Sequence, residues 1–333
     1  MTVLKIKQIT CISCGKCVLL CPTNHLRMIE GEIVASDHPD HPCIKCGHCM
    51  ASCASESIIV EGFDYADFKD IPEKIPSGSE LLDLLKHRRS IRQFRTRDVE
   101  REKIERIIAA AATVPMVSPP LKIEVVAFTS KDSIAPLLAP TVDIIREWLP
   151  DSGSNERGFN ESGFNEGGSN GSSSKESSSK ESSSKESSSN KGGMPPSAMW
   201  DVLRHFVHDG STKKFDEELA SQIRRILAKW DDGVNGLTHD APSMLLFHCA
   251  GNENFAREIS WLAVAYAMLA CESEELGSCI IGPIPPAINK SDELKRIAEI
   301  PDGNIATACL VMGYPSENYH KTIPRVFKSV KWR

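Results

Sequence analysis

Eight of the twelve cysteines in this chain of 333 residues lie in two runs of identical spacing near its beginning. The runs are Cys11-x2-Cys14-x2-Cys17-x3-Cys21 and Cys43-x2-Cys46-x2-Cys49-x3-Cys53. A glycine follows the second cysteine of each run, at Gly15 and Gly47, and lets the backbone approach a bound group closely. The first residues carry no long apolar stretch typical of a secretory signal, so bound metal explains the cysteines better than disulfides do.

Two kinds of metal site could use these thiols. A pair of zinc sites built on Cys-x2-Cys pairs would leave four of the cysteines unexplained, whereas two 4Fe–4S clusters use all eight. Three thiolates at three-residue spacing wrap one cluster on a tight loop, and we expect the fourth cysteine to begin a helix and to reach the other cluster. We therefore assign one cluster to Cys11, Cys14, Cys17 and Cys53, and the other to Cys21, Cys43, Cys46 and Cys49.

The double run resembles the two-cluster bacterial ferredoxins over residues 1–62, which we call the N-terminal unit. Pro22 stands after the first run as in that family, and Ala54 replaces the second proline. The resemblance implies a compact domain that carries electrons one at a time. Because such clusters do no bond chemistry, we expect an electron source or sink in the rest of the chain.

Charge and hydropathy exclude some classes of function. The formal net charge is −6, so the chain lacks the basic footprint of a nucleic-acid-binding protein. No stretch approaches the ~20 apolar residues of a membrane-spanning helix. We expect a cytoplasmic protein with no membrane or nucleic-acid partner. The other four cysteines lie in apolar stretches and are interpreted as small buried residues: Cys249, Cys271, Cys279 and Cys309.

The rest of the chain alternates helical and strand patterns. Residues 63–78 contain three proline and glycine positions and are interpreted as a linker. Ser77-Gly78-Ser79-Glu80 fits a capping box at the start of a helix. The periodicity predicts helices over 100–112 and 255–271 and strands over 122–128, 241–249 and 305–312. This alternation indicates a layered α+β or α/β fold over 79–333, the C-terminal unit.

One segment inside the C-terminal unit has low complexity. Within residues 151–193, Gly-Phe-Asn-Glu occurs at 158 and 163, and Ser-Ser-Ser-Lys-Glu occurs at 172, 177 and 182. Such a composition buries too little apolar surface to offset the entropy of ordering. We expect a disordered insertion; solvation alone or a docking or phosphorylation role both remain open for it.

The basic segment Arg88-Arg89-Ser90-Ile91-Arg92 follows the first of these helices. Such a segment can be a solvated face or an anion site, because arginine presents a fork of donors that matches a phosphate. Together with later segments it resembles the nitroreductase family. Those segments are Asp240-Ala241-Pro242 before a strand, an Ala-rich helix ending in Leu276-Gly277-Ser278-Cys279-Ile280-Ile281-Gly282, then Gly313-Tyr314-Pro315 and the C-terminal Arg325.

This resemblance implies a three-layer α/β/α domain with a mixed sheet, an intertwined homodimer and FMN bound at the interface. Carried over by position, Arg88, Arg89, Ser90 and Arg92 would hold the FMN phosphate and ribityl chain, and Arg325 would add a phosphate contact. Pro115, Met116, Val117 and Ser118 would lie along the flavin ring, and Ile280, Ile281 and Gly282 would back it. No Gly-x-Gly-x-x-Gly motif follows a strand, but this family binds NAD(P)H without one.

The expected function is that of an iron–sulfur flavoprotein oxidoreductase. Electrons from the clusters, from NAD(P)H or from a redox partner protein would reach FMN and then a small organic acceptor such as a nitroaromatic or a quinone. We expect no essential acid–base residue, and His87 and His248 are interpreted as structural. Two alternatives remain: a non-enzymatic electron carrier or redox sensor, and a flavin reductase of the same fold with another substrate.

Overall fold

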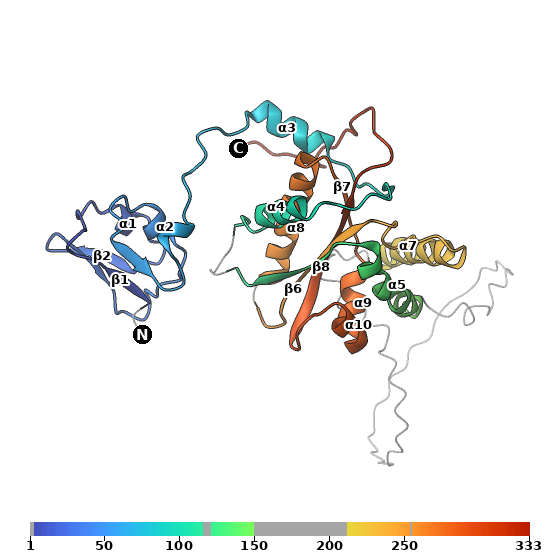
Figure 1. Cartoon of the computed structure of the whole chain (residues 1–333), viewed down its shortest axis with the longest axis horizontal. Helices are drawn as coiled ribbons and strands as arrows, with labels where there is room; N and C mark the ends of the chain where they lie inside the picture. The colour runs from blue at the N-terminus through green and yellow to red at the C-terminus, as the bar shows by residue number, and fades with distance from the viewer. Residues whose placement is uncertain (1–2, 116–120, 150–211, 254) are drawn as a thin grey trace, which may run out of the picture.

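The computed structural model describes residues 3–115, 121–149, 212–253 and 255–333. Within 212–253, side chains are described from residue 220 onward. Figure 1 shows the N-terminal unit apart from the larger C-terminal unit, with an extended segment between them. The predicted insertion over 151–193 lies outside the described residues, as do Met116, Val117 and Ser118. None of the described helices is both long and apolar enough to cross a membrane.

The N-terminal unit contains two small antiparallel pairs of strands. β1 (Leu4–Ile6) pairs with β4 (Ile58–Val60), and β2 (Leu26–Ile29) pairs with β3 (Glu32–Ala35). Its small core is made of Leu4, Cys17, Leu26, Ile33, Cys49, Met50, Ile58 and Val60. A core this small supplies little hydrophobic stabilisation by itself.

The two short helices of this unit do not begin at the fourth cysteine of each run, although the sequence predicted that they would. α1 (Lys16–Leu19) and α2 (His48–Ala51) are single turns that end before Cys21 and Cys53. The expectation that each fourth cysteine begins a helix is therefore wrong. The reason is that a left-handed glycine precedes each helix directly, so the helical turn carries the third cysteine of the run instead.

Part of the predicted linker packs on the N-terminal unit. The 3₁₀ turn η1 (Tyr65–Asp67) is capped by the Asp64 side chain, which accepts a hydrogen bond from the N–H of Ala66 at 3.0 Å. The side chains of Tyr65 and Phe68 pack against the core of the unit. Ordered packing therefore continues into the first residues of the 63–78 segment, and its exact boundary stays a prediction.

The C-terminal unit is built on a four-stranded sheet in the order β5-β6-β8-β7. Its strands are β5 (Ile123–Phe128), β6 (Ser243–Ala250), β8 (Asn304–Gly313) and β7 (Gly277–Ile280), and each neighbouring pair is antiparallel. A parallel bridge joins Ser90, which lies outside the named strands, to Ser278 of the edge strand β7. Among the described residues, parallel pairing in this mixed sheet is confined to that bridge.

Alternating side chains of the central strands face two helical layers, as expected for strands buried on both faces. Leu245 and Phe247 of β6 pack with α4 (Arg101–Ala111) and α8 (Ala256–Ser273). Met244 and Leu246 pack on the opposite side. That side is covered by α5 (Lys131–Arg146), α7 (Thr212–Asp231), α9 (Ile284–Lys290) and α10 (Asp292–Ile297). Figure 1 shows the two groups of helices on either side of the sheet.

Most elements agree with the periodicity, and the departures have physical causes. The predicted capping box is present before α3 (Gly78–His87), between Ser77 and Glu80. β7 is a strand where the sequence suggested the end of a helix, because α8 already ends at Ser273. α5 continues through Pro136 and Pro140 because its opposite face buries Ile134, Leu137, Val142 and Ile145.

Candidate functional site

The eight clustered cysteines line two separate cavities of the N-terminal unit. Cys11, Cys14, Cys17 and Cys53 line one cavity, and Cys21, Cys43, Cys46 and Cys49 line the other. Each cavity combines three cysteines of one run with the fourth of the other, which is the partition that the spacing predicts. No three His, Cys, Asp or Glu side chains in the described parts of the chain come close enough together to hold a single metal ion. That each quartet holds a cluster stays a prediction.

The two cavities have matching backbones. Residues with a left-handed backbone conformation occur at corresponding places in and just after the two runs. They are Ser13, Gly15 and Asn24 for the first run, and Lys45, Gly47 and Glu56 for the second. A left-handed residue turns the chain sharply, and such turns let each loop fold around the group that its cysteines bind.

Hydrogen bonds favour the ligating form of the fourth cysteines. The N–H of His25 lies 3.2 Å from the Cys21 sulfur, and the N–H of Ser57 lies 3.3 Å from the Cys53 sulfur. Burial opposes ionisation at both positions, but these and neighbouring donors outweigh it and lower the pKa of Cys21 and Cys53. A thiolate is the form that binds metal, so these donors prepare both thiols for ligation.

The candidate anion site of the C-terminal unit centres on Arg88. This residue follows α3 directly as its C-cap, and its N–H donates to the Leu84 carbonyl at 3.2 Å. Its Nη1 atom is buried and has no hydrogen-bond partner among the described residues. Burial, and then the charge of Arg325, lower the pKa of Arg88, while Glu272 opposes them. A buried, unpartnered guanidinium donor close to a second arginine fits an anionic group such as a phosphate.

The other residues of the basic segment have different surroundings. The bridge to Ser278 places Ser90 beside β7, and the N–H of Ile91 donates to the Ser278 carbonyl at 2.9 Å. Arg92 is exposed, and its charge acts on the buried Cys279 thiol. The guanidinium of Arg89 instead lies 5.1 Å from the ring centre of Tyr319. The structure therefore engages Arg89 with the C-terminal segment.

The residues predicted along the flavin ring are placed only in part. Pro115 is exposed at the end of the described segment, and the three residues after it are not described. Ile280 is half-buried at the end of β7, and Ile281 is buried in the core beneath α5 and α9. Gly282 is exposed, and a Cβ added there would meet no atom within 4 Å. Open space beside Gly282 is compatible with a flat ring.

Two further residues lie near the arginines and were not predicted from the sequence. The carboxylate of Glu272 lies 2.7 Å from His87 Nδ1 and accepts from the Arg89 N–H at 3.4 Å. The backbone of His239 has the left-handed conformation, with a φ of 57°. Burial, followed by the positive charge of Arg92, lowers the pKa of its imidazole to about 4. No spacing or motif connects either residue with the 88–92 segment, because tertiary folding alone brings them there.

Two family models match this chain. A model of the "Nitroreductase family" matches residues 85–314, and a "4Fe-4S dicluster domain" model matches residues 10–59. A comparison with curated proteins finds no match.

The solved structures that match include two nitroreductases with bound FMN, from Bacteroides fragilis NCTC 9343 and Desulfitobacterium hafniense DCB-2, and an FMN-dependent nitroreductase from Clostridium difficile R20291. Their identities are 13%, 14% and 15%, and the TM-scores are 0.46, 0.47 and 0.42. The matches cover 76%, 76% and 75% of this chain and 98%, 97% and 98% of those chains. Because the family model spans more than half of the chain, the chain belongs to the nitroreductase family of FMN-dependent oxidoreductases and carries a 4Fe–4S dicluster domain in front.

Proposed function

We propose that the chain is an iron–sulfur flavoprotein that passes electrons between two 4Fe–4S clusters, or NAD(P)H, and FMN to reduce a small organic acceptor such as a nitroaromatic or a quinone. The observation that carries this proposal is the unpartnered, buried Nη1 atom of Arg88 with the charge of Arg325 nearby. A buried donor atom of a charged group is costly without a partner, so a site of this kind is built for an anion that arrives with the ligand.

The residues of the chain bind and orient in this proposal. Arg88 and Arg325 hold the FMN phosphate, and Ser90 and Arg92 contact the ribityl chain. Glu272 holds the turn that carries Arg88, because it accepts from the Arg89 N–H. Bound FMN would supply a group that takes up electrons singly or in pairs, and the clusters would supply single electrons.

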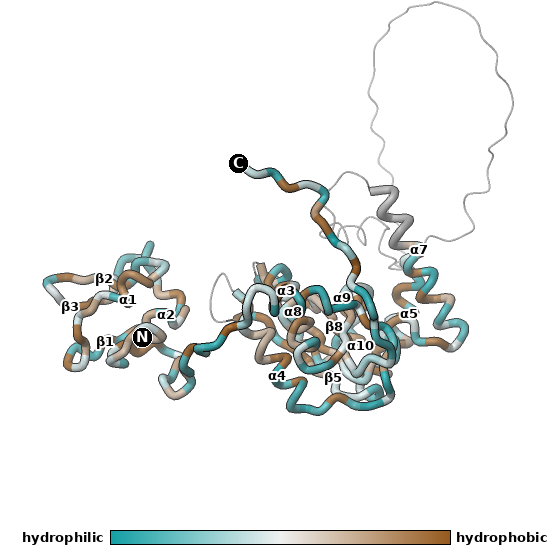
Figure 2. The backbone as a smooth tube through the Cα atoms, turned by 90° about the horizontal axis from the view of Figure 1, so that it is seen from above, coloured by the Kyte–Doolittle hydropathy of each residue, from teal (hydrophilic) through white to brown (hydrophobic). Residues whose placement is uncertain are grey.

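We further propose that the protein works as a homodimer. The C-terminal segment extends away from the body in Figure 2 and exposes large apolar side chains. These are Ile323, Val326, Phe327, Val330 and Trp332. On α3, Leu81, Leu82 and Leu85 are also exposed. An apolar arm and an apolar helix face of this kind are typical of a surface that a second copy covers.

A reducing cytoplasm suits the eight free thiols of the N-terminal unit.

Purification without oxygen, followed by iron, sulfide and flavin analysis, tests the proposal. We expect about eight iron atoms and one FMN per chain. Turnover is then measured with NADH, with NADPH and with a chemically reduced ferredoxin as donors, against a nitroaromatic and a quinone. Saturable turnover with any of these pairs supports the enzyme. Full iron and FMN without turnover would favour an electron carrier or sensor, and iron without FMN would reject the Arg88 site.

A further inference from the structure

The chain that follows β8 runs back beside the continuation of the basic segment, in the opposite direction. The N–H of Arg95 donates to the Tyr314 carbonyl at 2.8 Å. The N–H of Ser316 donates to the Gln93 carbonyl at 3.0 Å, and an isolated antiparallel bridge lies between these two hydrogen bonds. The backbone therefore fixes the first residues after β8 to the body of the C-terminal unit.

Tyr319, three residues after Ser316, gives the same segment a second attachment. The guanidinium carbon of Arg89 lies over the Tyr319 ring, 5.1 Å from its centre. An aromatic face attracts a cation within about 6 Å of the ring centre. The Arg89 backbone is held in turn, because its N–H donates to the Glu272 carboxylate at 3.4 Å. The stack thus ties the C-terminal segment to a fixed point of the basic segment.

Arg88 and Arg89 are adjacent in the chain but have different surroundings. With a ψ of 129°, Arg88 has left the helical conformation of α3. Successive side chains of an extended chain point to opposite sides. The Nη1 atom of Arg88 is buried without a partner, whereas the guanidinium of Arg89 stacks on Tyr319. The two arginines can therefore serve the anion site in different ways.

Arg325, the second predicted contact of the FMN phosphate, lies farther along the segment that Tyr319 attaches. It is exposed, and it follows Tyr319 by six residues and Ser316 by nine. An attachment at Tyr319 therefore shortens the free length of chain before Arg325. A shorter tether holds its end at a higher local concentration and loses less entropy when that end binds.

We propose that Arg89 and Tyr319 form a clasp that holds the C-terminal segment and positions Arg325 for the FMN phosphate. Arg89 and Tyr319 are then positioning residues that act through Arg325, and Arg89 does not itself contact the phosphate. This inference rests on the proposed FMN site. It assigns a role to Tyr319, which no motif in the sequence singles out.

Fluorescence titration of the flavin-free full chain with FMN tests the clasp. Tyr319→Leu and Arg89→Leu should each weaken FMN binding by roughly two- to fivefold, the equivalent of one exposed cation–π contact. Tyr319→Phe keeps the aromatic face and should bind FMN like the parent chain. Lys321→Leu is the control, because it removes an exposed cation from the same segment and leaves the clasp in place.

A double variant separates the clasp from a merely structural role. In an Arg325→Leu background, Tyr319→Leu should weaken FMN binding no further, because the clasp acts through Arg325. Thermal denaturation of the flavin-free variants should give parent-like unfolding temperatures, which shows that each variant is folded.

Three outcomes would overturn the clasp. The first is parent-like FMN affinity in Tyr319→Leu, and the second is an additive loss in the double variant. The third is a loss of roughly 10- to 100-fold in Arg89→Leu that Tyr319→Leu does not share, because it would show that Arg89 contacts the phosphate itself. A parent chain that binds no FMN would instead overturn the proposed function.

Discussion

The main-chain N–H of Ile91 donates to the Ser278 carbonyl at 2.9 Å, although 187 residues separate the two positions. This hydrogen bond places the basic segment against the edge strand β7. The approach is so close that a Cβ added at Gly277 would lie 2.4 Å from Cγ1 of Ile91. The geometry of the candidate anion site therefore depends on a glycine at the start of β7.

Gly277→Ala should push the basic segment away from β7. We expect a loss of about 1–3 kcal/mol in the free energy of unfolding, as for other overpacked sites, and weaker FMN binding. Denaturant titration followed by tryptophan fluorescence measures the stability of the C-terminal unit, since all five tryptophans lie beyond residue 147. Gly282→Ala is the matched control, because its Cβ meets nothing within 4 Å and stability should not fall. Equal stabilities of the two variants would contradict this account.

Arg88→Leu should have opposite effects on the free and the FMN-bound protein. Without FMN, the variant loses a half-buried guanidinium whose Nη1 atom has no partner, and it should be at least as stable as the parent chain. With FMN, it loses a hydrogen bond to a charged group worth about 1.5–3 kcal/mol, which corresponds to roughly 10- to 100-fold weaker binding.

Fluorescence titration of the flavin-free protein gives the FMN affinity, and thermal denaturation gives the stability. Arg101→Leu is the control, since Arg101 is exposed on α4 and pairs with Glu105. FMN affinity should not change in that variant. Loss of stability in flavin-free Arg88→Leu would show that Arg88 has a structural role instead.

His239 should make the stability of the flavin-free C-terminal unit depend on pH. Its pKa is about 4 when folded, against an ordinary value of 6.5. Between these values the unfolded chain binds a proton that the folded chain does not. Stability should therefore fall as the pH drops below about 6.5 and level off below about 4, by on the order of 1–3 kcal/mol.

Urea unfolding at pH 7.5 and at pH 5 tests this dependence. His239→Asn should reduce the difference between the two pH values, and asparagine tolerates the left-handed backbone at this position. His320→Asn changes an exposed histidine and should leave the difference as it is. An undiminished difference in His239→Asn would assign the pH dependence to another group.

Removal of iron should unfold the N-terminal unit alone. Its core is small and includes two of the cysteines predicted to bind the clusters, so metal binding supplies much of its folding free energy. After oxidative removal of the clusters with a chelator, limited proteolysis should release a fragment that begins within residues 63–78. Tryptophan fluorescence and FMN binding should persist in that fragment. Loss of either one would mean that the two units fold as one.

The local features of the chain follow from the sequence by short-range physical rules. The cysteine spacing predicts which thiols meet in each cavity, because three ligands at three-residue spacing must share one loop. Residues that are close together in the sequence are enough to predict the Ser77–Glu80 capping box and the periodicity of α4, α8, β5, β6 and β8. The resemblance to the nitroreductase family also predicted Arg88 and Arg325 as contacts of the FMN phosphate without any structural information.

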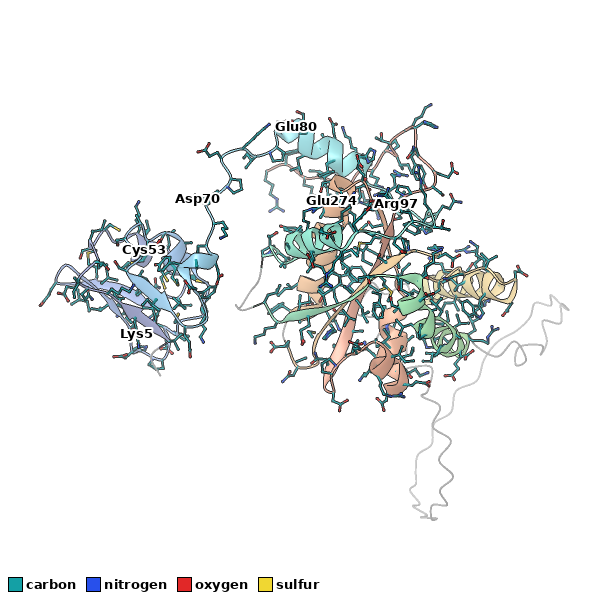
Figure 3. The ribbon with its side chains drawn as sticks, viewed as in Figure 1. Lys5, Cys53, Asp70, Glu80, Arg97 and Glu274 are labelled. Atoms are coloured by element: carbon teal, nitrogen blue, oxygen red, sulfur yellow. The ribbon has the colours of Figure 1, made fainter. Side chains whose placement is uncertain are left out.

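Tertiary structure alone decided which distant residues meet. Glu272 of α8 reaches the turn after α3, and His239, in the loop before β6, comes under the influence of the Arg92 charge. Arg106 and Glu274, the latter labelled in Figure 3, form an ion pair at 2.7 Å between α4 and the end of α8. Such contacts depend on how the layers pack, and no local pattern in the chain encodes them.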